Sequence, residues 1–339
     1  MSPCFNEARG IRYELMLERR VVMIGGKGGV GKTTCAAALA LHCAQSGERT
    51  LVVSTDQTPS LADIFELPVS PREPCPVTEG LFAWELGFDE LRKMWDRKFG
   101  REVYEVFSAL VSIQYEEFVE FISSVLPGLA EEFMVDHIRE LALGGGYQRI
   151  VWDTAPMGHT LGLLKTPRML REHLKPAPRI YSRLRLRDKS RRSILETILQ
   201  WEELSAQDMT FLQDEVSYVL VLIPEALAVH QLDRILAELA PGRLAVGDLI
   251  VNGVVMDADS DFLSRRALEQ RPYLELIERR YQGLRIHRVP LFAEEVKGLP
   301  RIERVRAALF PAGGPSPTQR GTFFARNASG ISAPRGSNR

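Results

Sequence analysis

The sequence predicts an α/β fold in which a mostly parallel sheet is covered by helices on both faces. Two observations support this expectation. Short apolar runs that do not alternate with polar residues recur along the chain, which is typical of strands buried on both faces. Helical patterns separate several of these runs, as connections between parallel strands require. The expected strands are residues 20–25, 50–55, 149–153, 216–223, 248–252 and 284–289.

Two long segments interrupt the alternation of strands and helices. Residues 89–143 and 168–214 are almost entirely helical in pattern, and we expect them to form one helical subdomain inserted into a domain spanning 20–310. Residues 1–19 are then an N-terminal extension. Residues 311–339 are rich in Gly, Ser, Arg and Asn, a composition that cannot bury a core and predicts a disordered tail.

The bulk composition limits the classes of protein. The chain has 339 residues, 45% of them hydrophobic and 26% charged, which suits one large globular domain with an insertion. Its formal net charge of -1 gives no general attraction to nucleic acid, so no specific nucleic-acid binding is expected. The sequence has no run of 18 apolar residues, so no transmembrane helix is expected. Four cysteines without a C-x-x-C pair, and no secretory segment, favour a cytoplasmic protein, with peripheral membrane association left open.

A glycine-rich motif follows the first expected strand and opens a helix at 32–46. Residues 26–33, GKGGVGKT, fit G-x-x-x-x-G-K-[ST], whose backbone N–H groups point at phosphate oxygens. Lys32 is expected to reach the β- and γ-phosphates, and the Thr33 hydroxyl to bind Mg²⁺. The sequence therefore predicts ATP and magnesium as ligands. The predicted phosphate-binding residues are Gly26, Lys27, Gly28, Gly29, Val30, Gly31, Lys32, Thr33 and Thr34.

Two aspartates end expected strands near this loop. Asp56 follows the second strand, where a carboxylate can orient or deprotonate the attacking water. Asp153 ends a third strand and is suited to holding Mg²⁺ through water. Lys32 and Asp56 are accordingly predicted catalytic residues.

The string GKGGVGKTT at 26–34 resembles the deviant P-loop of the signal-recognition-like ATPases. Further stretches are similar to the arsenite-pump and tail-anchor targeting ATPases within that group. They are DTAPMGHTL at 153–161, STD at 54–56 with SLAD at 60–63, LPG at 126–128, IPEALAV at 223–229, VN at 251–252, PLF at 290–292 and EVKG at 295–298. These matches run in order from about residue 21 to 309.

The resemblance implies a homodimeric ATPase in which Lys27 crosses to the partner's nucleotide and is a third catalytic residue. It also implies that Asn252 reads the adenine, and that Pro290, Leu291 and Phe292 close over the base. In targeting members the helical insertion forms a hydrophobic groove for a client's membrane segment. The apolar residues near Val103 and Phe118 can line such a groove or pack the subdomain's own core.

Three departures from the family pattern keep other functions open. The first switch reads Asp56, Gln57, Thr58, Pro59 where D-P-A is usual, which leaves open a nucleotide switch that gates a partner with slow hydrolysis. Residues 259–262 lack the zinc-binding C-x-x-C of some members, so no zinc is expected. One P-loop and unclustered cysteines weaken the alternative of an arsenite- or antimonite-stimulated ATPase subunit of an efflux pump. The leading hypothesis is capture and membrane delivery of tail-anchored segments, with a membrane-bound partner.

Overall fold

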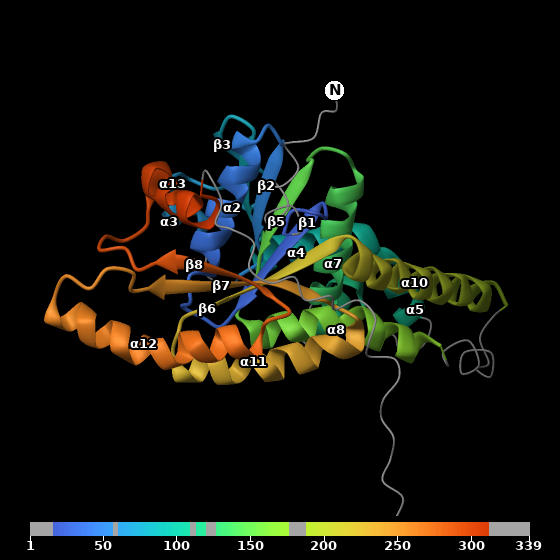
Figure 1. Ribbon diagram of the computed structural model, residues 1–339. Helices are drawn as coiled ribbons and strands as arrows, with labels where there is room; N and C mark the ends of the chain where they lie inside the picture. The colour runs from blue at the N-terminus through green and yellow to red at the C-terminus, as the bar shows by residue number, and fades with distance from the viewer. Residues whose placement is uncertain (1–15, 57–59, 109–112, 120–126, 176–187, 312–339) are drawn as a thin grey trace, which may run out of the picture.

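An eight-stranded sheet forms the centre of the computed structural model, which describes residues 16–56, 60–108, 113–119, 127–175 and 188–311. The strand order is β3-β4-β2-β5-β1-β6-β7-β8, and every pair is parallel except β3 with β4 (Figure 1). The strands are β1 (Val21–Gly26), β2 (Thr50–Ser54), β3 (Cys75–Thr78), β4 (Leu81–Glu85), β5 (Arg149–Asp153), β6 (Val216–Leu222), β7 (Val246–Val254) and β8 (Arg285–Pro290).

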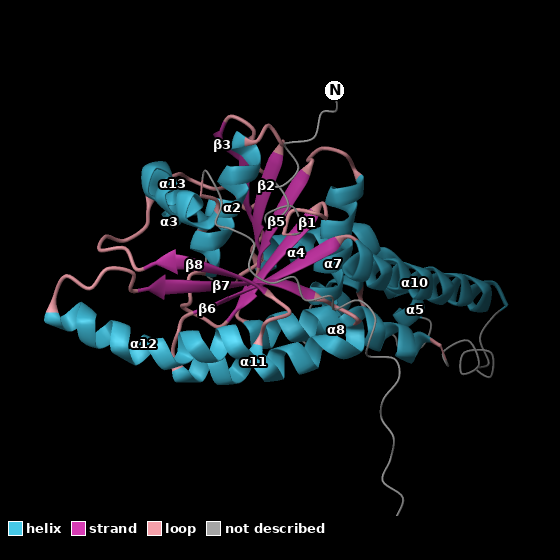
Figure 2. Cartoon of the chain, viewed as in Figure 1, coloured by secondary structure: helices cyan, strands magenta, loops and turns pink. Residues whose placement is uncertain are grey.

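Helices cover both faces of the sheet, as Figure 2 shows. One face carries α2 (Lys32–Gln45), α3 (Leu61–Phe65) and α13 (Gly298–Leu309). The other face carries a larger set. It consists of α4 (Phe88–Trp95), the π-helical turn η1 (Asp96–Gly100), α5 (Arg101–Ser108), α7 (Pro127–Leu143), α8 (Met157–Leu174), α10 (Asp188–Asp214), α11 (Ala226–Leu239), the 3₁₀ turn η2 (Ala240–Gly242) and α12 (Asp261–Arg280).

The apolar strands form these two layers because successive side chains of a strand point to opposite faces. In β1, Val21 and Met23 join the core on the α7–α8 face, while Val22 and Ile24 join the core under α2. All four are at most 2% exposed. Burial on both faces explains why the strand sequences read as continuous apolar runs.

The predicted fold class is confirmed, and each of the six expected strands is present. Two further strands, β3 and β4, were missed; β3 is a half-exposed edge strand, and β4 is a five-residue run that pairs with it. Both long segments contain helices, but the second starts inside α8, which continues through Pro167 to Leu174. Their separation as an inserted subdomain stays a prediction, as do the terminal boundaries.

The apolar residues expected in the helical insertion are only partly described. Val103 and Phe118 are 7% and 0% exposed and belong to the core on that face of the sheet. They therefore pack the interior rather than line an open groove. Residues 109–112 and 120–126 lie outside the described part of the chain. Among the described residues, no helix has the length and apolar character needed to cross a membrane.

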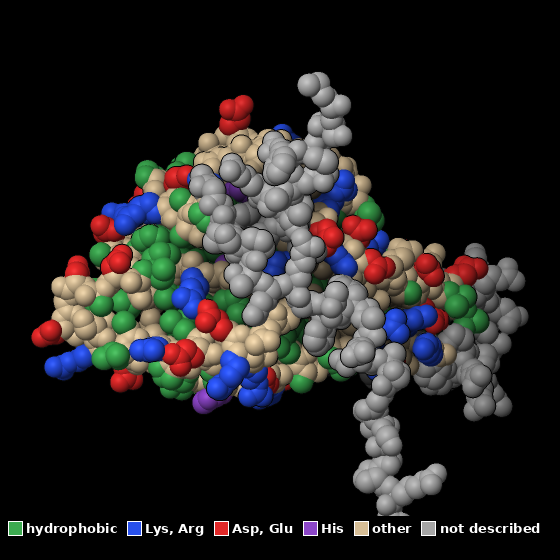
Figure 3. Space-filling view, viewed as in Figure 1, with side chains coloured by type: hydrophobic (Ala, Val, Ile, Leu, Met, Phe, Trp, Pro, Cys, Tyr) green, Lys and Arg blue, Asp and Glu red, His purple; other side chains and the backbone are tan. Residues whose placement is uncertain are grey.

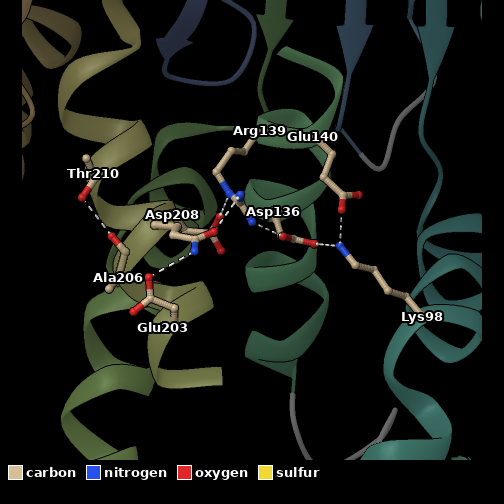
Figure 4. Close-up of polar contacts among 9 residues, drawn as sticks. Lys98, Asp136, Arg139, Glu140, Glu203, Ala206, Asp208 and Thr210 are labelled. Atoms are coloured by element: carbon tan, nitrogen blue, oxygen red, sulfur yellow. Dashed lines mark hydrogen bonds and ion pairs between the residues drawn. The ribbon is translucent and has the colours of Figure 1, made fainter. Parts of the chain in front are cut away.

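A buried polar network joins three of these helical elements (Figure 4). Arg139 of α7 donates hydrogen bonds of 2.6 Å to Asp208 of α10 and to Asp136 of its own helix. Lys98 of η1 forms ion pairs with Asp136 and with Glu140. Because buried charges are costly unless paired, the network fixes how α7, α10 and η1 pack together.

Candidate nucleotide site

The glycine-rich loop runs from the end of β1 to the start of α2 and is braced from below by β7. Asn252 Nδ2 donates a 2.9 Å hydrogen bond to the Val30 carbonyl. Gly31 has a φ of 91°, and a Cβ there would lie 2.2 Å from Asn252 Nδ2. Only glycine satisfies both the left-handed backbone and the close approach. The expected role of Asn252 in reading adenine stays a prediction; its observed contact is with the loop.

A cluster of hydroxyls surrounds the carboxylate of Asp153, which is fully buried. Thr33 Oγ1 donates to Asp153 Oδ2 at 2.8 Å, and Ser54 Oγ donates to the same oxygen at 3.2 Å. The Thr33 hydroxyl also lies 3.1 Å from Ser60 Oγ. Burial raises the pKa of Asp153 to about 6, against the opposing effects of the Thr33 hydrogen bond and the Lys32 charge.

These oxygens fit a magnesium ion that also binds phosphate. Asp153 Oδ1 is buried and has no hydrogen-bond partner among the described residues. Within that part of the chain, no group of three or more His, Cys, Asp or Glu side chains is arranged to hold a metal. Mg²⁺ commonly uses one or two protein oxygens together with substrate phosphates and water, so one hydroxyl and one carboxylate suit it.

A pocket of about 560 Å³ opens over this cluster and collects most of the predicted site residues. The predicted residues that line it are Gly28, Gly29, Gly31, Lys32, Thr33, Thr34, Asp56, Asn252, Pro290, Leu291 and Phe292. Its volume lies in the range of small-molecule sites. Glu294, Glu295 and Lys297 extend the wall beyond Phe292. The guanidinium of Arg304 lies 5.0 Å from the centre of the Phe292 ring, which holds this wall against α13.

Four predicted residues do not line the pocket. Gly26 and Val30 are buried beneath the loop, and Asp153 lies below Thr33. Lys27 is exposed, and its carbonyl is 3.4 Å from Lys32 Nζ. Lys32 is buried at the base of the loop, whereas Lys27 is exposed and does not line the pocket.

Sequence reasoning missed Glu85, which ends β4. Its Oε1 accepts hydrogen bonds from the backbone N–H groups of Leu61 at 2.6 Å and Ala62 at 3.0 Å. These bonds fix the first turn of α3 and with it Ser60. The apolar run that precedes Glu85 was the available signal, but β4 was not recognised as a strand.

Comparisons with known proteins agree with this geometry. A family model described as anion-transporting ATPase matches residues 19–311. ATPase GET3B of Arabidopsis thaliana is 31% identical over 324 residues, covering 84% of this chain and 77% of that protein. A protein of Aquifex aeolicus (strain VF5), provisionally named arsenical pump-driving ATPase 2, is 30% identical over 295 residues, covering 84% and 97%.

ATPase ARSA1 of Chlamydomonas reinhardtii is 29% identical over 324 residues. The match covers 84% of this chain but only 42% of that protein, so the chain spans less than half of this relative. The family model, in contrast, covers nearly the whole described part of the chain. The chain belongs to the anion-transporting ATPase family.

Proposed function

We propose that this ATPase works as a homodimer that couples ATP binding and hydrolysis to the capture and membrane delivery of hydrophobic, tail-anchored protein segments. The observation that supports a nucleotide-driven dimer best is the position of Lys27, exposed and outside its own pocket. A P-loop lysine that does not line its own nucleotide pocket is suited to a neighbouring one.

Each site residue has a distinct role in this proposal. Lys32 and the loop N–H groups bind the phosphates, and Thr33 and Asp153 hold magnesium, which supplies positive charge beside them. Asp56, on the pocket wall, orients the attacking water and accepts its proton. Lys27 of one subunit neutralises charge on the partner's transferring phosphoryl group.

Exposed apolar side chains near the pocket support the dimer. Met256, Phe262 and Leu291 are 58%, 73% and 49% exposed. Leu291 N–H donates to the Val254 carbonyl at 2.8 Å, so the chain after β8 and the chain after β7 are adjacent. Figure 3 shows hydrophobic side chains on the left of the molecule, where β7, β8 and the start of α12 lie. Exposed apolar surface next to the nucleotide pocket suits a contact between two subunits that forms when ATP binds.

Support for a hydrophobic client comes from the helical layer and from the switch motif at 153–161. Helices α8 and α10 lie side by side and extend past the sheet (Figure 1). The motif runs from Asp153, the last residue of β5, into the start of α8 at Met157, so it connects the nucleotide site to that layer. Relatives named GET3B and GET3C lie in the same family.

The test is co-purification with a co-expressed tail-anchored segment, with and without ATP. We expect a complex that depends on nucleotide and survives gel filtration. Asp56→Asn should retain the segment in ATP, because hydrolysis is blocked, whereas Lys32→Ala should not capture it. A matched segment with two arginines in its apolar stretch serves as the control client. Absence of a complex, with ATP still hydrolysed, contradicts the carrier function.

An arsenite- or antimonite-stimulated ATPase is the second candidate, supported by the provisional name of the Aquifex relative. Two of the cysteines oppose it. Cys35 and Cys43 are buried on α2, and burial raises the pKa of each thiol to about 12. Metalloid ligands must be thiolates, which these two resist forming. Stimulation of hydrolysis by antimonite would favour this candidate over the carrier.

A slow nucleotide switch that gates a partner is the third candidate, because residues 57–59 depart from the family pattern. It predicts the same single-turnover rate for the wild type and for Asp56→Asn. A clear loss of rate in the variant would instead support hydrolysis as part of the cycle.

A further inference from the structure

Trp152 occupies the middle of the sheet with its indole N–H directed at the first switch. It is 0% exposed and lies one residue before Asp153 in β5. Its Nε1–H donates a 2.9 Å hydrogen bond to Thr55 Oγ1, and Thr55 is itself only 8% exposed. The pairing of β2 with β5 places Val53 beside Trp152 and Ser54 beside Asp153. The bond therefore reaches along the sheet, from one strand to the residue just past the end of its neighbour.

Thr55 is also held by the backbone of β5. Its N–H donates to the Asp153 carbonyl at 3.0 Å, and its hydroxyl lies 3.4 Å from the same oxygen. The Thr55 hydroxyl can thus donate to Asp153 and accept from Trp152 at once. A β-branched side chain whose hydroxyl is used both as a donor and as an acceptor is restricted to one rotamer.

Asp56 follows Thr55 directly in the chain. Its N–H lies 3.4 Å from Ser54 Oγ, which in turn donates to Asp153 Oδ2. Because Thr55 is anchored to β5 through its N–H and its hydroxyl, it restrains the backbone that leads into Asp56. A catalytic group displaced by about 1 Å can lose on the order of a hundredfold in rate, so the anchor of Thr55 matters for chemistry.

The other side of Trp152 faces the helical layer. It belongs to the same core cluster as Phe133 and Ile138 of α7 and Leu161 of α8. A buried indole N–H that lost its acceptor would be left unsatisfied at a cost in free energy, so the ring and Thr55 should move together. Trp152 thus joins the packed helices to the residue before Asp56.

We propose that Trp152 is a positioning residue for ATP hydrolysis, which fixes Asp56 through its hydrogen bond to Thr55. The proposal rests on the proposed ATPase mechanism, in which Asp56 orients the attacking water. It assigns to the indole N–H a function beyond filling the core. If Trp152 only packed the core, removing its N–H would lower the stability of the protein and leave kcat unchanged.

The test compares steady-state hydrolysis by the full-length wild type, Trp152→Phe, Thr55→Val, Thr55→Ser and the double variant Trp152→Phe/Thr55→Val. Phenylalanine keeps an aromatic ring without a donor. We expect Trp152→Phe to lower kcat about tenfold with KM changed less than about twofold, because nucleotide binding does not use the indole. Thr55→Val should lose a similar factor, and the double variant should lose no more than the worse single variant. Thr55→Ser keeps the hydroxyl and should retain most of the rate.

Trp84→Phe is the matched control. Trp84 is 5% exposed, and its indole donates to the Pro71 carbonyl at 3.1 Å, away from the pocket. Its variant should show a comparable change in Tm with kcat unchanged. Equal kcat for Trp152→Phe and Trp84→Phe would overturn the positioning role, as would additive losses in the double variant. If the wild type hydrolyses ATP no faster than Lys32→Ala, the proposed mechanism itself fails, and Trp152 has no reaction to position.

Discussion

The hydroxyl of Thr33, at the start of α2, donates a 2.8 Å hydrogen bond to the carboxylate of Asp153, at the end of β5. The glycine-rich loop and the second switch therefore share a direct contact. Burial raises the pKa of Asp153 to about 6, which means that the charged carboxylate is disfavoured. The Thr33 and Ser54 hydroxyls and the Lys32 charge stabilise the carboxylate against this effect. A divalent cation beside it would compensate that cost, which links this contact to magnesium.

Asp153→Asn tests that link. The amide keeps an oxygen that can accept from Thr33 and almost the same volume, but it carries no charge. We expect hydrolysis at saturating magnesium to fall by about a hundredfold and the half-saturating magnesium concentration to rise at least about tenfold. Titration of the rate with MgCl₂ measures both. Asp248→Asn, at another buried aspartate, paired with Arg285, is the control and should keep the magnesium dependence. An unchanged magnesium curve for Asp153→Asn would remove Asp153 from the metal site.

Gly31→Ala should destabilise the nucleotide-free protein more than Gly29→Ala. Both glycines have positive φ, 91° and 78°, so alanine costs about 1–2 kcal/mol at each. A Cβ at position 29 meets no atom within 4 Å, whereas one at 31 lies 2.2 Å from Asn252 Nδ2. Thermal unfolding of the two variants measures the difference. Adding Asn252→Ala to both variants should reduce the difference in Tm between them, because the side chain that the new Cβ meets is removed. An unchanged difference would mean that crowding against Asn252 does not cause it.

The strands and the glycine-rich loop were predictable because their signals are local. Runs such as 21–26 are apolar throughout since both faces of the sheet are covered, and the loop motif follows one of them directly. Strand β4 was not predicted because an apolar run of five residues cannot be identified as a strand by periodicity alone. Its omission concealed Glu85, whose role depends on where β4 ends beside α3.

Contacts across the sheet could not be predicted, because they depend on register. Asp56 and Asp153 were recognised as strand ends, but the alignment of Ser54 with Asp153 appears only when β2 pairs with β5. The bond from Trp152 to Thr55 follows from the same register. The hydrogen bond from the Asn252 amide to the Val30 carbonyl is likewise set by the approach of β7 to the loop, while its assignment to adenine stays a prediction.

Lys27→Ala should abolish hydrolysis while leaving ATP affinity within about threefold of the wild type, because Lys27 does not line its own pocket. Mixing distinguishes a role in the partner's site from a local one. In a mixed dimer of Lys27→Ala with Asp56→Asn, the first subunit keeps Asp56 and receives Lys27 from the second. Equal mixing of the two inactive variants should restore about a quarter of the wild-type rate in a two-fold dimer. No recovery, with exchange of subunits shown by a tag, would place Lys27 in its own site.

Stability should fall as the pH rises from about 4 to 7 because of Asp208. This carboxyl is fully buried against Arg139, and burial raises its pKa to about 7, with Asp136 adding to the rise and Arg139 and Lys98 opposing it. The folded state therefore binds this proton more tightly than the unfolded chain does. The free energy of unfolding is largest where Asp208 is protonated and falls as the pH rises through its folded pKa.

Asp208→Asn removes this titration while keeping an acceptor for Arg139. We expect Tm of the wild type to drop by a few degrees more than that of Asp208→Asn between pH 5 and pH 7.5. Differential scanning calorimetry without nucleotide measures both profiles, and Asp153 contributes equally to each. Asp214→Asn, at the end of α10, is the control and should keep the wild-type slope. Parallel profiles for the wild type and Asp208→Asn would mean that Arg139 keeps Asp208 ionised in the folded protein, and that the ion pair outweighs burial in the contact between α7 and α10.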